Sequence, residues 1–227
     1  MNTTQIAGLN TRIVERAGLA ATATTVVLMH GFGAPGDDLV SLAGALRAEV
    51  RWVFPEAPVG LGGMYGEARA WWMIDMNRLE RQMRAGGADL STEVPAGLHE
   101  ARAQMLAFLT ELDTRFSGKL VLGGFSQGSM MAVDLALHRE VPPAALVLYS
   151  STVLAKTEWQ PLLPRLAGIP VLQSHGRQDM VLPYSAAESL RDLMTTAGAI
   201  VEWIPFAGGH EIPRPVLAAT DALLMRL

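Results

Sequence analysis

The sequence predicts an α/β fold with a mostly parallel, twisted central sheet and helices on both faces. Short apolar, β-branched runs alternate with helical patterns from about residue 24 onward, as they do in sheets buried on both faces. The 227 residues are 50% hydrophobic and 18% charged, enough chain for one sizeable core. We therefore expect one domain over residues 1–227.

The predicted strands are short runs that are apolar on both faces and rich in β-branched residues. They lie at 24–30, 51–55, 119–125, 144–150, 170–176 and 200–206. Near the N-terminus, TQIAGL and TRIVER flank Asn10 and predict an antiparallel hairpin added at one edge of the sheet.

Apolar residues at helical spacing predict helices between these strands. One apolar face runs from Leu39 to Val50, behind the capping candidates Asp37 and Asp38. Others run from Leu98 to Phe116 and from Val216 to Leu227.

The stretch GFSQG at 124–128 lies between a predicted strand and a predicted helix. It is the G-x-S-x-G pattern of a nucleophile elbow, in which a sharp turn exposes the hydroxyl of Ser126 at the carboxyl end of the strand. Glycines two positions either side allow strand and helix to approach closely. The alternative is a serine that caps the helix, with glycines that only pack.

An acid and a base follow Ser126 in the order that such an elbow requires. Asp179, in SHGRQDMVLP, comes just after one strand, and His210, in FAGGHEIP, comes after the last. Asp179 is expected to hold the His210 imidazole in the tautomer that takes the serine proton. The competing interpretation of Asp179 is a helix cap.

The segment MHGFGAPGDDL follows the first parallel strand. In this arrangement that loop supplies one backbone donor to an oxyanion hole, and the residue after the nucleophile supplies the other. These donors are predicted to be the N–H groups of Phe32 and Gln127. His30 and Gly31 are interpreted as loop-shaping, so neither a metal nor a cofactor is expected.

The region 56–94 is rich in Gly, Met and Trp and is predicted to be a lid-like loop and helix insertion. The alternative to a lid in its second half is a solvated helix that packs on the surface. The alternative to a pocket role for Trp71 and Trp72 is that they pack this region onto the core. An apolar acyl pocket is predicted from this region and from the two residues beside the acid. The nominated side chains are Met64, Tyr65, Trp71, Trp72, Met73, Val181 and Leu182.

Composition excludes several classes of function. The chain has no cysteine, which rules out a thiol nucleophile, disulfides and cysteine-based metal sites. A net charge of -4 without a basic block argues against nucleic-acid binding. The N-terminus lacks a secretory run and LAATATTVVLMHGFG is too short to span a bilayer. We expect a cytoplasmic monomer or homodimer without stable membrane insertion.

Several stretches together resemble the phospholipase/carboxylesterase family of α/β-hydrolases, which includes the acyl-protein thioesterases. They are HGFGAPGDDL, FPEAPVG, RAWWMID, GGFSQGS, GRQDMVLP and GGHEI. The resemblance implies an α/β-hydrolase fold with Ser126 as nucleophile, Asp179 as acid and His210 as base. The sequence departs from the family at Phe32, where members commonly have leucine, and in the segment 70–93, which is longer than in the acyl-protein thioesterases and resembles bacterial esterase branches.

The function expected from these residues is a serine carboxylesterase that hydrolyses small to medium acyl esters through an acyl-enzyme on Ser126. The alternative within enzymes is a lysophospholipase or acyl thioesterase, which would use the same residues on a substrate with a longer acyl chain. A ligand-binding member of the fold that no longer turns over is the alternative from another class.

Overall fold

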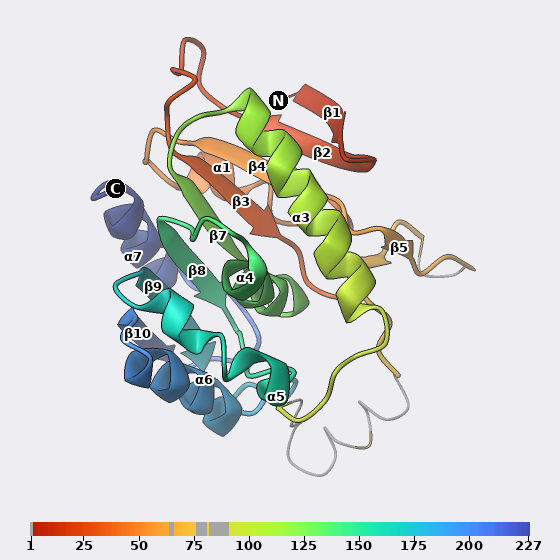
Figure 1. The fold of residues 1–227 in the computed structure, drawn as a ribbon, viewed down its shortest axis with the longest axis vertical. Coiled ribbons are helices and arrows are strands. Elements are labelled where there is room, and N and C mark those ends of the chain that lie inside the picture. Colours follow the sequence, from red (N-terminus) through yellow and green to blue (C-terminus); the bar gives the residue numbers. More distant parts are fainter. Residues whose placement is uncertain (1, 64–65, 76–80, 82–90) are drawn as a thin grey trace.

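The computed structural model describes residues 2–63, 66–75, 81 and 91–227. Its centre is an eight-stranded sheet in the order β1-β2-β4-β3-β7-β8-β9-β10 (Figure 1). Every neighbouring pair from β4 to β10 is parallel, whereas β1, β2 and β4 pair antiparallel. The predicted α/β fold is confirmed. The strands are β1 (Asn2–Ile6), β2 (Leu9–Val14), β3 (Thr25–Met29), β4 (Arg51–Pro55), β7 (Leu120–Phe125), β8 (Ala145–Tyr149), β9 (Pro170–Gly176) and β10 (Ile200–Phe206).

The N-terminal hairpin is present, but its turn is not at Asn10. Ile6 pairs with Leu9 across a two-residue loop, in which Ala7 and Gly8 have φ of 46° and 79°. Positive φ at both positions matches the twist of the flanking strands, and glycine supplies it without steric cost. The prediction was wrong by a few residues because it did not consider Ala7-Gly8 as the turn.

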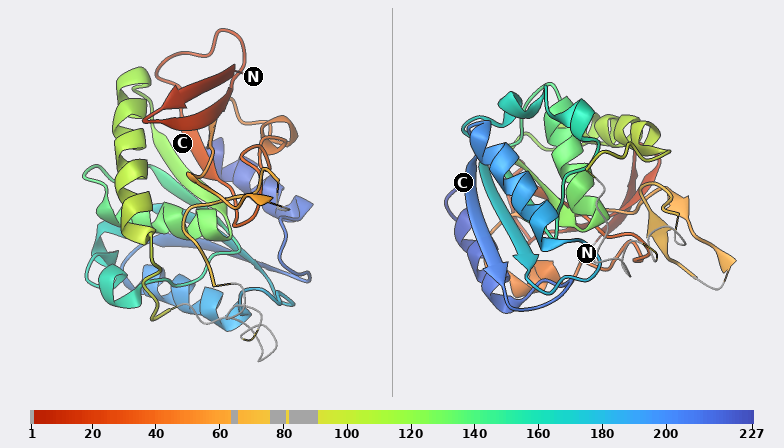
Figure 2. Two further views of the ribbon diagram at one scale, coloured as in Figure 1. Left: turned by 90° about the vertical axis from the view of Figure 1, so that its right-hand side faces the viewer. Right: turned by 90° about the horizontal axis from the view of Figure 1, so that it is seen from below.

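Helices cover both faces of the sheet, and the left view of Figure 2 shows α3 and α7 on opposite sides of it. Buried residues of α3, α4 and α6 pack with Val27, Met29 and their neighbours in one core. Val216 of α7 belongs to the core on the opposite face. The helices are α1 (Leu42–Ala45), α3 (Leu98–Arg115), α4 (Gln127–His138), α5 (Lys156–Trp159), α6 (Tyr184–Thr196) and α7 (Arg214–Leu224), with a 3₁₀ turn η2 (Leu163–Leu166).

The helix predicted over 39–50 is shortened to the four residues of α1. Leu46 is extended, with φ of -101°, and the N–H groups of Arg47 and Ala48 both donate to Asp221 Oδ1 at 2.8 Å. These two bonds to α7 take the place of helical ones. Leu39, Leu46 and Val50 are nevertheless buried. The apolar pattern therefore predicted correctly which side chains are buried, but the prediction of a helix over the whole stretch was wrong.

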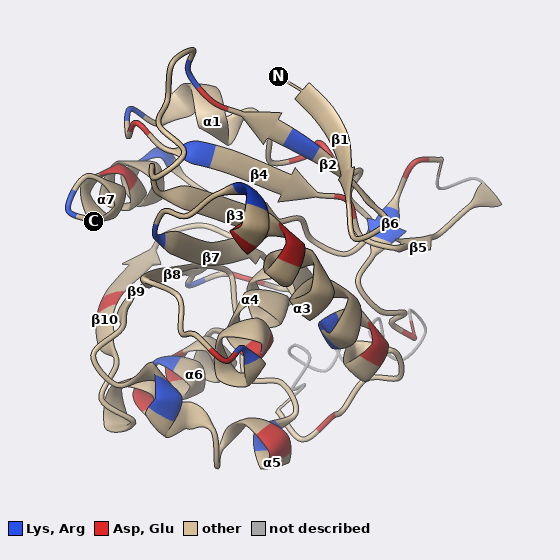
Figure 3. Ribbon diagram, turned by 45° about the horizontal axis from the view of Figure 1, so that its top comes forward, with Lys and Arg blue, Asp and Glu red and all other residues tan. Residues whose placement is uncertain are grey.

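The predicted insertion at 56–94 begins with a small antiparallel ribbon of β5 (Val59–Gly60) and β6 (Arg69–Ala70). Most of its second half, including the predicted lid helix, lies outside the described residues. Figure 3 shows acidic and basic positions interspersed along α3 and over the rest of the ribbon, in keeping with the small net charge of -4.

Candidate active site

Ser126 occupies the turn between β7 and α4 with φ of 53° and ψ of -118°. A positive φ is strained for a residue with a side chain and is found where the surroundings impose it. Here the Ser126 N–H is held by the carbonyl of Tyr149 at 2.9 Å. The strand–turn–helix geometry of a nucleophile elbow is therefore present.

The two glycines of the elbow are required by close backbone approach. A Cβ at Gly124 would lie 2.4 Å from the Met29 carbonyl oxygen, and a Cβ at Gly128 would lie 2.0 Å from the same atom. Both distances are shorter than any van der Waals contact. The glycines let the start of α4 pack directly against the end of β3, which fixes where Ser126 projects.

The loops after β9 and β10 bring an acid and a histidine together. His210 Nδ1 donates to Asp179 Oδ2 at 2.7 Å, and the Asp179 side chain has no exposed surface. The loops are held side by side, since Arg177 N–H donates to Phe206 O and Gln178 N–H donates to Gly208 O, each at 2.9 Å. The expectation that Asp179 faces His210 is met in the geometry.

The position of His210 depends on a close approach of two loops. Gly208 and Gly209 do not have positive φ. Instead, a Cβ at Gly176 would lie 2.1 Å from the Gly209 carbonyl oxygen and 2.4 Å from that of Gly208. The close approach of the two loops, rather than a left-handed turn, sets the position of His210.

The Asp179 carboxylate is fully supplied with donors. Its Oδ1 accepts from the N–H groups of Val181 and Leu182 at 2.8 and 2.9 Å. Burial alone would raise the pKa of Asp179, but the hydrogen bond and charge of His210, with those two N–H groups, outweigh it and lower the pKa. Asp179 is therefore ionised at neutral pH.

A second histidine lies against this carboxylate. His175 is fully buried; its Nε2 donates to the Leu182 carbonyl at 3.0 Å and lies 3.3 Å from Asp179 Oδ2. Burial lowers the pKa of His175, so the ring is neutral. Sequence reasoning did not connect His175 with Asp179, although the spacing of four residues around a strand end was a usable signal.

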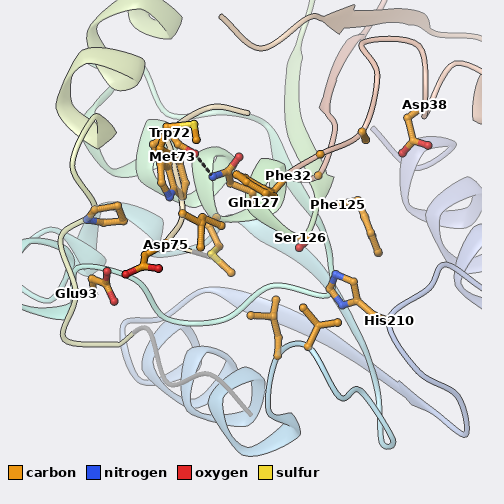
Figure 4. A pocket seen from close by; sticks show the side chains of 18 residues that line it. Phe32, Asp38, Trp72, Met73, Asp75, Glu93, Phe125, Ser126, Gln127 and His210 are labelled. Atoms are coloured by element: carbon orange, nitrogen blue, oxygen red, sulfur yellow. Dashed lines mark hydrogen bonds between the residues drawn. The ribbon is translucent and has the colours of Figure 1, made fainter. Parts of the chain in front are cut away.

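A cavity of about 480 Å³ opens over Ser126 and His210. Figure 4 shows the His210 imidazole directed toward Ser126 across this space. Trp72, Met73, Val181 and Leu182, which were nominated for the acyl pocket, line this cavity, and so do Phe32 and Gln127, which were nominated as oxyanion donors. Met64 and Tyr65, also nominated, lie outside the described residues.

Trp71 does not line the cavity. It is 1% exposed, its indole N–H donates to the His30 carbonyl at 2.9 Å, and its ring lies 5.5 Å from the His30 ring. This is the packing alternative considered above for one of the two tryptophans. Trp72, the next residue in the chain, does line the cavity.

Further lining residues were not predicted. Met130 follows Ser126 by four positions, so helical periodicity alone places it on the same side of α4. Ile74, Pro95 and Phe125 add apolar surface, and Figure 4 shows Asp75 and Glu93 at the end of the cavity away from His210, with Asp38 on the other side.

His30 shapes the loop that carries Phe32. Its Nδ1 donates to the Gly31 carbonyl at 2.8 Å, and its Nε2 accepts from Ala57 N–H at 3.1 Å. Burial lowers the pKa of His30, which fits a neutral ring that donates at one nitrogen and accepts at the other. Over the described ranges, no three His, Asp or Glu side chains gather as a metal site requires.

The sequence matches the profile of phospholipases and carboxylesterases over residues 10–224. The chain belongs to the phospholipase/carboxylesterase family. Together with the parallel sheet and the elbow, this makes the protein an α/β-hydrolase and a hydrolytic enzyme. None of the helices in the part of the chain described is long and apolar enough to cross a membrane.

The similarity to known proteins extends over most of the chain. Acyl-protein thioesterase 1 of Neurospora crassa is 26% identical over 212 residues, which cover 88% of this chain and 85% of that protein. The crystal structure of esterase PE8 is 25% identical, with a TM-score of 0.78 over 96% of this chain and 98% of that one. Acyl-protein thioesterase 2 of Zea mays shares the fold with a TM-score of 0.74 at 22% identity, over 95% of this chain and 97% of that one.

Proposed function

We propose that the protein is a serine carboxylesterase that hydrolyses small to medium acyl esters through an acyl-enzyme on Ser126. One observation carries the proposal: the strained Ser126 shares a cavity with His210, which is hydrogen-bonded to the buried, ionised Asp179. This is the nucleophile, base and acid set of acyl transfer.

In the first half-reaction, Ser126 Oγ attacks the ester carbonyl carbon while His210 Nε2 takes the hydroxyl proton. The negative charge on the carbonyl oxygen is bound by the N–H groups of Phe32 and Gln127. His210 then gives its proton to the alcohol that leaves. Asp179 stabilises the imidazolium through the 2.7 Å bond to Nδ1.

In the second half-reaction, a water molecule replaces the alcohol. His210 takes a proton from this water, whose oxygen attacks the acyl carbon to form a second tetrahedral intermediate. The bond from the acyl carbon to Ser126 Oγ then breaks, and His210 returns the proton to Oγ. The products are the carboxylic acid and the free enzyme. Neither step requires a metal or a cofactor.

The cavity supports an acyl group of limited size. Its volume of about 480 Å³ lies within the range of small-molecule pockets, about 300 to 1,000 Å³. Trp72, Met73, Met130 and Leu182 give it adaptable apolar walls. We expect the enzyme to act in the cytoplasm, as a monomer or homodimer, on small-molecule esters.

Acyl thioesters are the second candidate substrate class, since several relatives bear the name acyl-protein thioesterase 1. The same serine, histidine and acid would serve, because the chemistry at the acyl carbon is unchanged and only the leaving group differs. Lysophospholipids belong to the same alternative.

The deciding experiment is hydrolysis of p-nitrophenyl esters with about two to about sixteen acyl carbons, compared with matched acyl thioesters. Ser126→Ala is the matched variant, and we expect it to lose at least about 10³-fold in kcat/KM while remaining folded. An organophosphonate probe should label wild type and not Ser126→Ala.

The outcomes separate the classes. A maximum at short or medium chains, abolished by Ser126→Ala, supports the carboxylesterase. A maximum at long chains or on thioesters favours the second candidate. Well-folded wild-type protein that neither turns over nor takes the probe would mean a non-catalytic, ligand-binding member of the fold.

A further inference from the structure

The Gln127 side chain makes contacts that the elbow pattern does not require. Its Oε1 accepts from Trp71 N–H at 2.9 Å, and its Nε2 donates to the Trp72 carbonyl at 2.9 Å, drawn dashed in Figure 4. The residue is 2% exposed, so water competes little for either bond. We call these two hydrogen bonds the Gln127 clasp; they tie the start of α4 to the segment 69–72.

That segment is also bonded to the loop after β3. Gly33 N–H donates to the Arg69 carbonyl at 2.8 Å, and Arg69 N–H donates to the Ala34 carbonyl at 3.0 Å. The Trp71 indole N–H donates to the His30 carbonyl at 2.9 Å. These three hydrogen bonds hold the loop on both sides of Phe32.

We propose that the Gln127 side chain is a positioning residue for the oxyanion hole. The inference rests on the proposed function, in which Phe32 and Gln127 donate their N–H groups to the oxyanion. These donors belong to separate elements, and such donors stabilise a transition state only when they are preorganised. The clasp, through segment 69–72, fixes one element against the other and also fixes Trp72 in the cavity wall.

Gln127→Glu tests the clasp because its effect depends on protonation. A protonated glutamic acid repeats both bonds, accepting from Trp71 and donating its O–H to the Trp72 carbonyl. A carboxylate cannot, because it has no proton for that carbonyl, and its charge also repels the oxyanion. Burial raises the pKa of such a carboxyl, which brings the change into the range where the enzyme can be assayed.

The measurement is kcat/KM of Gln127→Glu relative to wild type on one short ester. We expect this ratio to fall at least about tenfold from about pH 5.5 to about pH 8.5. Taking the ratio removes the pH dependence that the two proteins have in common. Gln160→Glu, which adds the same charge at an exposed position, should keep a constant ratio. A Gln127→Glu ratio that does not change with pH would overturn the proposal.

Gln127→Met removes both bonds without adding charge. We expect its kcat to fall about tenfold with KM changed less than about threefold, as for the loss of an interaction made in the transition state. A folded Gln127→Met protein with wild-type kcat would overturn the proposal, even if Gln127→Glu fails to fold.

Amide hydrogen exchange at Trp71 gives a readout that does not depend on activity. Loss of the clasp should speed this exchange in Gln127→Met by at least about tenfold. A Trp71 exchange rate in Gln127→Met equal to that of wild type would show that the clasp does not hold this segment. If wild type has no Ser126-dependent turnover, the proposed function fails, and the exchange measurement still decides whether the clasp holds the segment.

Discussion

At the scale of single residues, the Asp179 carboxylate organises the loops after β9 and β10. It accepts from His210 and from two backbone N–H groups and has the ring of His175 beside it. Each donor favours the ionised form, so this group contributes to stability as well as to the proposed proton transfer. The loop 179–182 and the position of His210 depend on the same charge.

This contribution should vanish in acid. The pKa of Asp179 is lowered in the folded state, so its stabilisation is present above the unfolded value of about 3.9 and is lost as pH falls through the folded value. We expect Asp179→Asn to be less stable than wild type near pH 7, with the difference shrinking below about pH 4. Urea unfolding of both proteins at several pH values measures it.

The control for that series is Asp113→Asn, at a side chain that is 47% exposed. It removes one acidic charge without disturbing the loops. A stability difference between wild type and Asp179→Asn that is equal at both ends of the pH range would contradict the assignment.

At the scale of elements, the strand–turn–helix unit depends on how closely α4 approaches β3. We expect Gly128→Ala to destabilise the protein by about 3 kcal/mol or to prevent folding, since overpacking costs about 1 to 3 kcal/mol and occasionally more. The added Cβ would lie 2.0 Å from the Met29 carbonyl oxygen, and neither backbone can move without displacing Ser126. Thermal and urea unfolding report the change.

Gly44→Ala is the matched control, because a Cβ there meets nothing within 4 Å and the residue lies in α1. Alanine should stabilise this helical position by up to about 1 kcal/mol. If both variants lose the same free energy of unfolding, the close approach of α4 to β3 is not the cause of the loss at Gly128.

At the scale of the whole molecule, a buried ion pair joins the helices on one face. Asp134, with no exposed surface, accepts from Arg102 Nε and Nη2 at 2.6 and 2.8 Å and from Trp159 Nε1 at 2.8 Å. These residues belong to α4, α3 and α5, all three of which are labelled in Figure 1. The helix that begins behind Ser126 is therefore anchored at its middle as well.

Removing one partner of this pair should be costly. We expect Asp134→Ala to lower the free energy of unfolding by about 3 kcal/mol, because it leaves the Trp159 N–H without its acceptor and the Arg102 charge with Glu158 as its remaining partner. Asp113→Ala, at the exposed pair with Arg139, should cost less than about 1 kcal/mol. Equal losses in urea unfolding would show that burial does not set the value of the Asp134 pair.

The sequence alone determined the strands of the parallel sheet and the helices α3, α4 and α7. Each of the six strands predicted from residue 24 onward is present within one residue at each end, because runs such as the one before Ser126 are apolar on both faces and can be recognised from the local sequence. Ser126, Asp179 and His210 were nominated because each follows a predicted strand and because the three come in the order serine, acid, histidine that a nucleophile elbow requires. The catalytic roles of these residues stay a prediction.

Contacts between distant parts of the chain decided the rest. Asp221 ends α1 by binding Arg47 and Ala48, which lie 174 and 173 residues away, and Gln127 binds Trp71 across 56 residues. No local periodicity encodes such bonds. Buried amide and carboxylate groups need hydrogen-bond partners. Which groups become their partners depends on which parts of the chain the tertiary fold brings together.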